Sequence, residues 1–298
     1  MSESVMASSP QPTLTLQQLV GIVGPYPEAG KHGAPQNWQG MIHIFAGVHG
    51  TFGAPPAHGQ TISTAEETAG KSALLYYLFG FTYGDDGEFK FGIPNLRGLI
   101  AVGGTPRVEA PPTLRLTAVI AAESGGVMVG SIGFFGGKFA PPGWLACDGT
   151  AYSFRDYPQL HAAIGATFGG DGGSFRVPDL SGRAAVGAGS APGIPAVALG
   201  QSVMGPVPGL GLTAMIAVEG DYPNQCGPGE FPLTKPFVGQ ILFSATPRVP
   251  AGWLPADGRE LPIPTNMVLY SVLGNAYGGD QRRNFALPDL RGRMVVGQ

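Results

Sequence analysis

The chain has 298 residues, of which 43% are hydrophobic and 12% are charged, and its formal net charge is −3. This balance provides no basic surface, which argues against nucleic acid as a partner. The sequence has no run of 18 apolar residues and no basic start followed by an apolar core. Neither a membrane span nor a cleaved signal peptide is therefore expected.

The first predicted element is a strand near the N-terminus whose sequence occurs three times in the chain. Similar sequences fill residues 14–22, 114–121 and 210–217, each long enough for a strand of seven to nine residues. Recurring apolar positions of this kind indicate a strand with a buried face. In the first copy these positions, to which we assign a role in assembly, are Leu14, Leu16, Leu19 and Ile22.

A longer unit follows each of these strands, so the chain contains three tandem copies of one sequence pattern. The units span residues 40–103, 130–187 and 239–298. The segments between them span residues 1–39, 104–129 and 188–238. We interpret the first segment as a strand with a linker that is a possible donor strand, and the other two as linkers that each carry a strand. An internal repeat of this length indicates a built array of modules rather than one catalytic pocket.

Each unit opens with a short strand of alternating apolar residues and then turns sharply. In units two and three a Pro/Gly or Ala/Gly turn ends at Trp144 and Trp253, which we predict to be buried anchors. Asp-Gly pairs typical of tight turns follow at residues 148–149 and 257–258. Unit one has no tryptophan at this place and carries His58 before its turn glycine.

A short helix is expected after these turns in every unit. In unit two Asp156 is the predicted N-cap and Pro158 suits the first turn. Thr265 takes the corresponding place in unit three, and Thr64 and Glu67 have the spacing of a capping box in unit one. Glycines that can end each helix follow the last apolar residue.

Each unit closes with the sequence Pro-Asp/Asn-Leu-x-Gly, which is typical of a turn. In units two and three an arginine stands four residues after the aspartate, so we predict the ion pairs Asp179–Arg183 and Asp289–Arg293. Surface charges without a structural role are the alternative.

The motifs GW-x-x-x-DG, aromatic-Gly-Gly-Asp and PDLRGR, in that order, resemble the phage tail collar family, which is also seen in proteins called microcystin-dependent. Unit one departs from the pattern by its missing tryptophan and by Asn95. The resemblance implies an α+β fold of three tandem, small, loop-rich modules. Each module would have short strands and one short helix, and extended β segments would join the modules. It also implies a non-enzymatic part of a phage tail fibre, or of a related surface structure, with members similar to receptor-binding regions of trimeric short tail fibres.

The order of strands and units leaves two pairings open. If each strand completes the preceding unit, the N-terminal strand of one molecule could complete unit three of another, which makes a head-to-tail filament or a ring. If each strand pairs with the following unit, the chain is self-contained. The three units could also pack as an internal pseudo-trimer that replaces three separate chains.

Sequence signatures of catalysis are missing. The chain has no G-x-S-x-G elbow, no Walker loop and no H-E-x-x-H, and its five histidines lack the spacing of a metal site. The acidic residues near Asp85 and Asp171 are better explained by turn chemistry than by calcium binding. Cys147 and Cys226 form no disulfide framework, and Cys147 is predicted to be a buried thiol. We expect no enzyme activity, no cofactor and no metal.

The sequence therefore predicts a structural or adhesive subunit of an extracellular assembly, foremost a phage tail fibre or tail-like particle located in the virion. Its partners would be copies of itself, as a trimer or a head-to-tail polymer, together with other tail proteins and cell-surface glycans. The first alternative is a bacterial surface or extracellular filament built by strand donation. The second is a soluble glycan-binding module.

Overall fold

The computed structural model describes residues 12–21, 26–27, 38–47, 55–63, 69–84, 90–108, 113–123, 127–222, 236–280 and 282–298. The described part of the chain is mostly β, with 44% of its residues in strands and 10% in helices. The expected α+β class is therefore wrong. The reason is that the strands expected to lie in linkers join strands of all three units in one 13-stranded sheet, while the helices stay short and peripheral.

The elements follow the same order in each unit. The first set is β1 (Thr13–Val20), β2 (Met41–Phe45), β3 (Thr61–Ser63), α1 (Ala69–Phe79), β4 (Lys90–Gly92), β5 (Ile100–Gly103) and β6 (Arg107–Val108). The second set is β7 (Thr113–Ala121), β8 (Ser131–Phe135), β9 (Trp144–Ala146), β10 (Ala151–Ser153), α2 (Pro158–Ile164), β11 (Gly170–Asp171), β12 (Ser174–Arg176) and β13 (Ala184–Gly187). After β14 (Gly189–Ala191), β15 (Ile194–Val197) and β16 (Ser202–Val203), the third set is β17 (Gly209–Ala217), β18 (Gln240–Ser244), β19 (Trp253–Pro255), β20 (Glu260–Pro262), η1 (Ile263–Thr265), α3 (Met267–Leu273), β21 (Asn284–Ala286) and β22 (Met294–Gly297).

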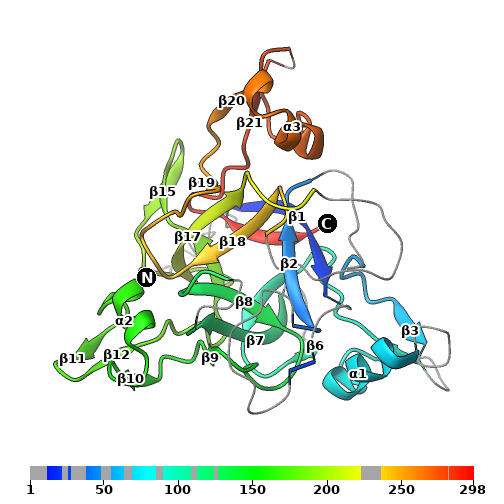
Figure 1. The fold of residues 1–298 in the computed structure, drawn as a ribbon, viewed down its shortest axis with the longest axis vertical. Helices are drawn as coiled ribbons and strands as arrows, with labels where there is room; N and C mark the ends of the chain where they lie inside the picture. Colours follow the sequence, from blue (N-terminus) through cyan, green and yellow to red (C-terminus); the bar gives the residue numbers. More distant parts are fainter. Residues whose placement is uncertain are drawn as a thin grey trace, which may run out of the picture.

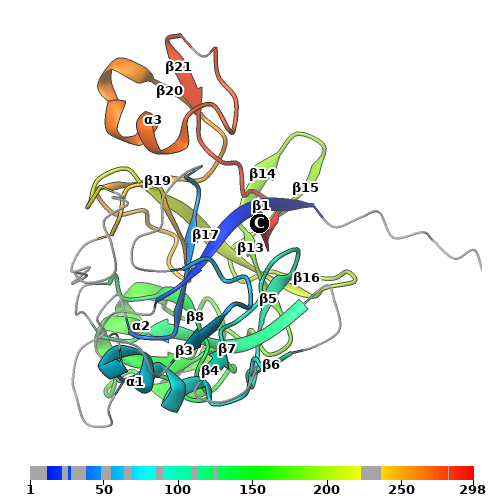
Figure 2. The same ribbon diagram turned by 90° about the vertical axis from the view of Figure 1, so that its right-hand side faces the viewer.

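Three arms project from the central sheet, one from each unit (Figure 1). Each arm joins one helix to a small antiparallel sheet: β3–β4 beside α1, β10–β12–β11 beside α2, and β20–β21 beside α3. Figure 2 shows the helices toward one end of the molecule, while β16 and the β14–β15 hairpin lie toward the other. The arms are therefore arranged about a common centre.

That centre is a triangle made by the opening strands of the three units. Strands β2, β8 and β18 pair antiparallel with one another in all three combinations, through partners such as Ile42 with Phe134 and Ile241 with Ile44. Each strand uses its first residues against one neighbour and its last residues against the other. This cyclic pairing gives the single chain an approximate three-fold arrangement.

The closing strands β5, β13 and β22 also come together near the other end, where β22 pairs antiparallel with both β5 and β13. Val296 pairs with Ile100, and Val186 pairs with Met294. Their buried side chains form a small separate core together with Val197 and Val207. The larger core contains buried residues of all three units. Neither core belongs to one unit alone, so apolar burial, the dominant favourable term in folding, ties the units together.

Several local expectations change in the structure. The residue before α2 is Tyr157, which makes no side-chain cap, and Asp156 lies one position earlier. Thr265 ends η1, and Asn266 precedes α3. The proposed capping box of Thr64 and Glu67 lies outside the described residues. The tract 188–209, expected to be an extended linker, instead contains β14, β15 and β16, because β14 pairs with β15 and β16 pairs with the start of β17.

Candidate functional site

The joints between the units are the most distinctive feature of the molecule, and the long strands β1, β7 and β17 build them. The first half of β7 runs parallel to β5 of unit one, and its second half runs antiparallel to β8 of unit two. Strand β17 joins β13 to β18 in the same manner. Each long strand therefore completes the unit before it and also starts the unit after it, so both pairings left open by the sequence are used.

Strand β1 closes the circle within the same chain. Residues Thr13 to Leu16 pair in parallel with Met294 to Gly297, and Gln17 to Val20 pair antiparallel with β2. The N-terminal strand thus completes unit three of its own molecule. The joint between β22 and β1, which we call the seam, is the one of the three that no intervening chain segment connects.

The residues assigned to assembly on β1 take different places. Leu16 and Leu19 are buried in the core, with exposed fractions of 1% and 0%. Leu14 is partly buried and packs against that core. Ile22 lies outside the described residues. Two of the four positions therefore anchor the strand directly, and their role in assembly stays a prediction.

A second contact recurs at every joint: the closing turn of one unit docks on the last strand of the unit before it. The amide of Gly292 donates to the carbonyl oxygen of Gly187 at 2.7 Å, and the amide of Gly187 donates to the Arg293 carbonyl oxygen at 3.1 Å. The same pair of bonds links Gly182 and Arg183 to Gly103. Gly98 and Leu99 make it with Gly297, so the seam has the same bonds as the covalently connected joints.

This docking explains a signal that the sequence analysis did not use, the glycine at the end of each closing strand. A Cβ atom on Gly103, Gly187 or Gly297 would overlap the carbonyl oxygen of Leu180, Leu290 or Leu96 respectively. The leucine is the one in the Pro-Asp/Asn-Leu turn that docks there. Because a backbone oxygen cannot move aside as a flexible side chain can, only glycine lets the turn approach so closely. The spacing between the turn and this glycine could have revealed the joint.

Replacing Gly187 by alanine is expected to lower the free energy of unfolding by about 1–3 kcal/mol, because the new methyl group pushes the Leu290 turn off β13. Gly172→Ala is the matched control, since nothing lies within 4 Å of its added Cβ. Urea unfolding followed by circular dichroism measures both. Equal unfolding midpoints for the two variants would show that the close approach contributes nothing to stability.

The predicted ion pairs are present beside these turns. Arg183 lies 3.5 Å from Asp179, and Arg293 lies 3.2 Å from Asp289. Both arginines also donate to the backbone carbonyl oxygen of the same aspartate, at 3.1 and 2.8 Å. Each arginine side chain therefore binds both the carboxylate and the backbone of the aspartate in the turn.

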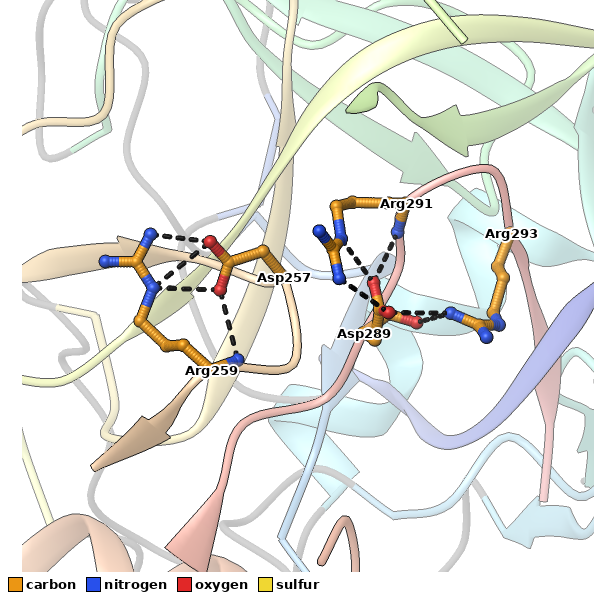
Figure 3. A network of polar contacts seen from close by, with 5 residues as sticks. All are labelled: Asp257, Arg259, Asp289, Arg291 and Arg293. Carbon is orange, nitrogen blue, oxygen red and sulfur yellow. Dashed lines mark hydrogen bonds and ion pairs between the residues drawn. The ribbon is translucent and has the colours of Figure 1, made fainter. Parts of the chain in front are cut away.

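Unit three extends this pair into a larger polar network, shown in Figure 3. Arg291 donates to both carboxylate oxygens of Asp289, at 2.9 and 3.0 Å, and Arg259 binds Asp257 in the neighbouring turn. Burial alone would raise the pKa of Asp289, but the hydrogen bonds from Arg291 and Arg293 outweigh it and leave the pKa below its usual range. Both aspartates also accept a backbone amide two residues on, as turn-forming side chains do.

Unit one keeps the turn with other side chains. The Asn95 side chain accepts a hydrogen bond from the amide of Arg97 at 3.2 Å. The backbones of His58 and Asn95 form an isolated antiparallel β-bridge, as those of Asp257 and Asp289 do. The Gln60 side chain accepts the His58 amide at 3.2 Å. The turn geometry therefore survives the departures from the motif.

The two tryptophan anchors differ in burial. Trp144 is 5% exposed and lies in the core, beside the central triangle. Trp253 is partly buried at the start of β19. The expectation of a buried anchor thus describes Trp144 better than Trp253. Cys147, expected to be buried, is a free buried thiol whose pKa is raised by burial.

His43 is the middle residue of β2, at the position where β8 of unit two has Gly133 and β18 of unit three has Leu242. Its ring meets the edge of Phe237 at 6.1 Å, and its Nε2 has no hydrogen-bond partner among the described residues. Burial lowers the pKa of His43 to about 4. The imidazole is therefore neutral in the folded protein at neutral pH.

We expect acid to destabilise the protein through His43. The folded-state pKa lies below the unfolded value, so the full stability is present above about pH 6.5 and is lost as the pH falls toward 4. The loss should reach about 3 kcal/mol, and His43→Leu, which copies unit three, should remove it. Urea unfolding at pH 7.5 and pH 4.5 measures the difference. His161→Gln serves as the control, and an unchanged acid loss in His43→Leu would contradict the prediction.

The described residues contain no group of three or more histidine, cysteine or acidic residues placed to hold a metal ion. Within the same part of the chain, no helix is long and apolar enough to cross a membrane.

These joints and turns define the class of protein: a single chain in which three similar β-rich modules close into a ring. The family described as Phage Tail Collar Domain matches residues 40–101, 130–185 and 239–295, which is more than half of the chain. The chain belongs to the phage tail collar domain family, and the expected resemblance over three tandem copies is confirmed. This family points to a structural component of the phage tail. Comparisons with curated proteins and with solved structures gave no match.

Proposed function

We propose that this protein is a non-enzymatic subunit of a phage tail fibre in which one chain takes the place of three. The observation that carries the proposal is the pairing of β1 with β22, which closes three modules into one ring. The cyclic pairing of β2, β8 and β18 supports it, because three separate collar modules in a trimer would need the same contacts. The protein would then present three arms at the tail.

A single chain offers something that three identical chains do not. Closed homo-oligomers repeat one surface by symmetry. Here each arm has its own sequence on the same scaffold, so the three arms can contact different partners. We therefore assign adhesion to the arms and a scaffolding role to the central sheet, with other tail proteins as partners.

The filament alternative rests on donation of β1 to a second molecule. In the closed ring this strand already occupies the edges of β22 and β2. Polymerisation would require the seam to open first, and the opened chain lacks the buried contacts of Leu16 and Leu19 until a second molecule accepts the strand. The ring therefore favours the tail subunit over the head-to-tail filament.

Two measurements test the proposal. Light scattering of the purified chain should give a monomer of 30.7 kDa, and electron microscopy should show compact three-armed particles. Immunogold labelling of tailed particles from the source strain should place the protein at the tail. Filaments of the purified chain, or labelling of cell-surface fibres instead of tails, would overturn the proposal in favour of the bacterial filament.

A further inference from the structure

The arm of unit one carries a group of large apolar side chains on its surface. The exposed fractions are 38% for Leu74, 74% for Tyr77 and 59% for Phe81. These residues, which we call the aromatic patch, lie three and four positions apart on α1 and the turn that follows it. Residues at this spacing share one face of a helix.

The other two arms show that the module does not need this patch to fold. The helices align by their buried leucine and closing glycine, which are Leu75 and Gly80 in unit one. At the three patch positions unit two has Gln159, Ala162 and Ala166, and unit three has Val268, Ser271 and Asn275. The two aromatic rings therefore replace small or polar side chains, and a structural requirement of the arm does not explain them.

Aromatic rings beneath the patch contact two of its members. Tyr76 packs edge-on against Phe81 at 5.6 Å and against Phe91 at 5.8 Å, and Phe91 is fully buried. Tyr77 lies 6.1 Å from the same Tyr76 ring. A chain of rings thus connects the core to the surface. A surface fixed in this way loses little conformational entropy when it binds a ligand.

The size and charge of the patch limit what it can bind. Its exposed side chains offer roughly 300 Å², taking ordinary areas for aromatic side chains. A second copy or another stable protein partner needs about 800 Å² on each side. No member of the patch is charged, so the patch lacks the basic residues that bind phosphate or an anionic membrane surface. What remains is a small neutral ligand with an apolar face and hydroxyl groups.

We propose that the aromatic patch is a binding site for neutral carbohydrate, with one or two hexose rings stacked by their C–H faces on Tyr77 and Phe81. The hydroxyl group of Tyr77 is a donor and acceptor for the sugar hydroxyls at the rim. The proposal deepens the adhesive role assigned above to the arms, on which it rests. It makes unit one the arm that touches the sugar, while units two and three lack the site.

Saturation-transfer NMR on the full chain tests the site with maltohexaose, cellohexaose and N-acetylchitohexaose as neutral probes and polygalacturonate as an anionic one. At least one neutral probe should bind, and the double variant Tyr77→Ala/Phe81→Ala should weaken its binding by about tenfold or more. This variant copies unit two, so it is expected to fold, and circular dichroism checks that it does. Met204→Ala is the control, because Met204 is apolar and 87% exposed but lies outside the patch.

Three results would overturn the proposal: no binding of any neutral probe, equal binding by the double variant, or tighter binding of polygalacturonate. A concentration-dependent dimer that the double variant loses would instead assign the patch to a second copy. The tail labelling described above is a separate measurement. If the labelling fails, the tail location is wrong, but the sugar-binding result still tests the patch. If sugar binding fails, the tail location is unaffected.

Discussion

Removal of residues 1–21, which takes away β1, is expected to destroy the closed ring. The deletion uncovers β22 and one edge of β2 and removes Leu16, Leu19 and Val20 from the core. Burial of three such side chains is worth about 5–9 kcal/mol. That amount is comparable to the whole stability of an ordinary domain, so the shortened chain should unfold or associate through its open edges.

Circular dichroism melting and light scattering measure this result. Deletion of residues 1–11 alone, which keeps β1 whole, is the control and should leave the melting midpoint and the monomeric state unchanged. A synthetic peptide of residues 12–21 should restore the melting transition of the longer deletion, since the strand forms its contacts without a covalent link to β22. A monomeric shortened chain with an unchanged midpoint would show that β1 does not close the ring.

The second large effect concerns the two tryptophans. Trp144→Ala should lower the free energy of unfolding by about 3–5 kcal/mol, because the side chain is 5% exposed and its loss leaves a cavity beside the central triangle. Trp253→Ala should cost roughly half as much, since its side chain is only partly buried and solvent can fill the space.

Trp144→Phe is the matched control for packing. It keeps an aromatic ring and removes the Nε1 donor, which is buried without a hydrogen-bond partner among the described residues. Removing that donor breaks no hydrogen bond. The free energy of unfolding of the phenylalanine variant should therefore be much closer to that of the original protein than the value of the alanine variant is. Urea unfolding of the three variants decides the order. Equal losses for Trp144→Ala and Trp253→Ala would contradict the role given to burial.

The turns and their partners were predictable from the sequence. Asp179 and Asp289 were expected to form turns and to pair with Arg183 and Arg293, and the structure contains both ion pairs. Such features depend on residues four or fewer positions apart, where the chain has few alternatives. The caps at Asp156 and Thr265 were predicted on the same local basis, but each lies one residue too early, because Tyr157 and Asn266 are the residues that precede α2 and α3.

The fold class, the partner of β1 and the role of Gly187 could not be derived in this way. Each depends on contacts between residues far apart in the chain: Leu16 pairs with Gly297, and Gly187 lies against the Leu290 turn. A strand presents the same edge to its own chain and to a second molecule, so its sequence cannot distinguish the two pairings.

By itself, the sequence determined that three copies of one module exist, which family they belong to, and where their turns and tryptophans stand. Only the tertiary structure decided that the copies close into one ring within a single chain. It also decided that the connecting strands belong to the sheet, that His43 is buried, and that the aromatic patch stands on one arm alone. The physical reason is that local turn chemistry is encoded over a few residues, whereas ring closure depends on which distant strand edges and apolar faces meet.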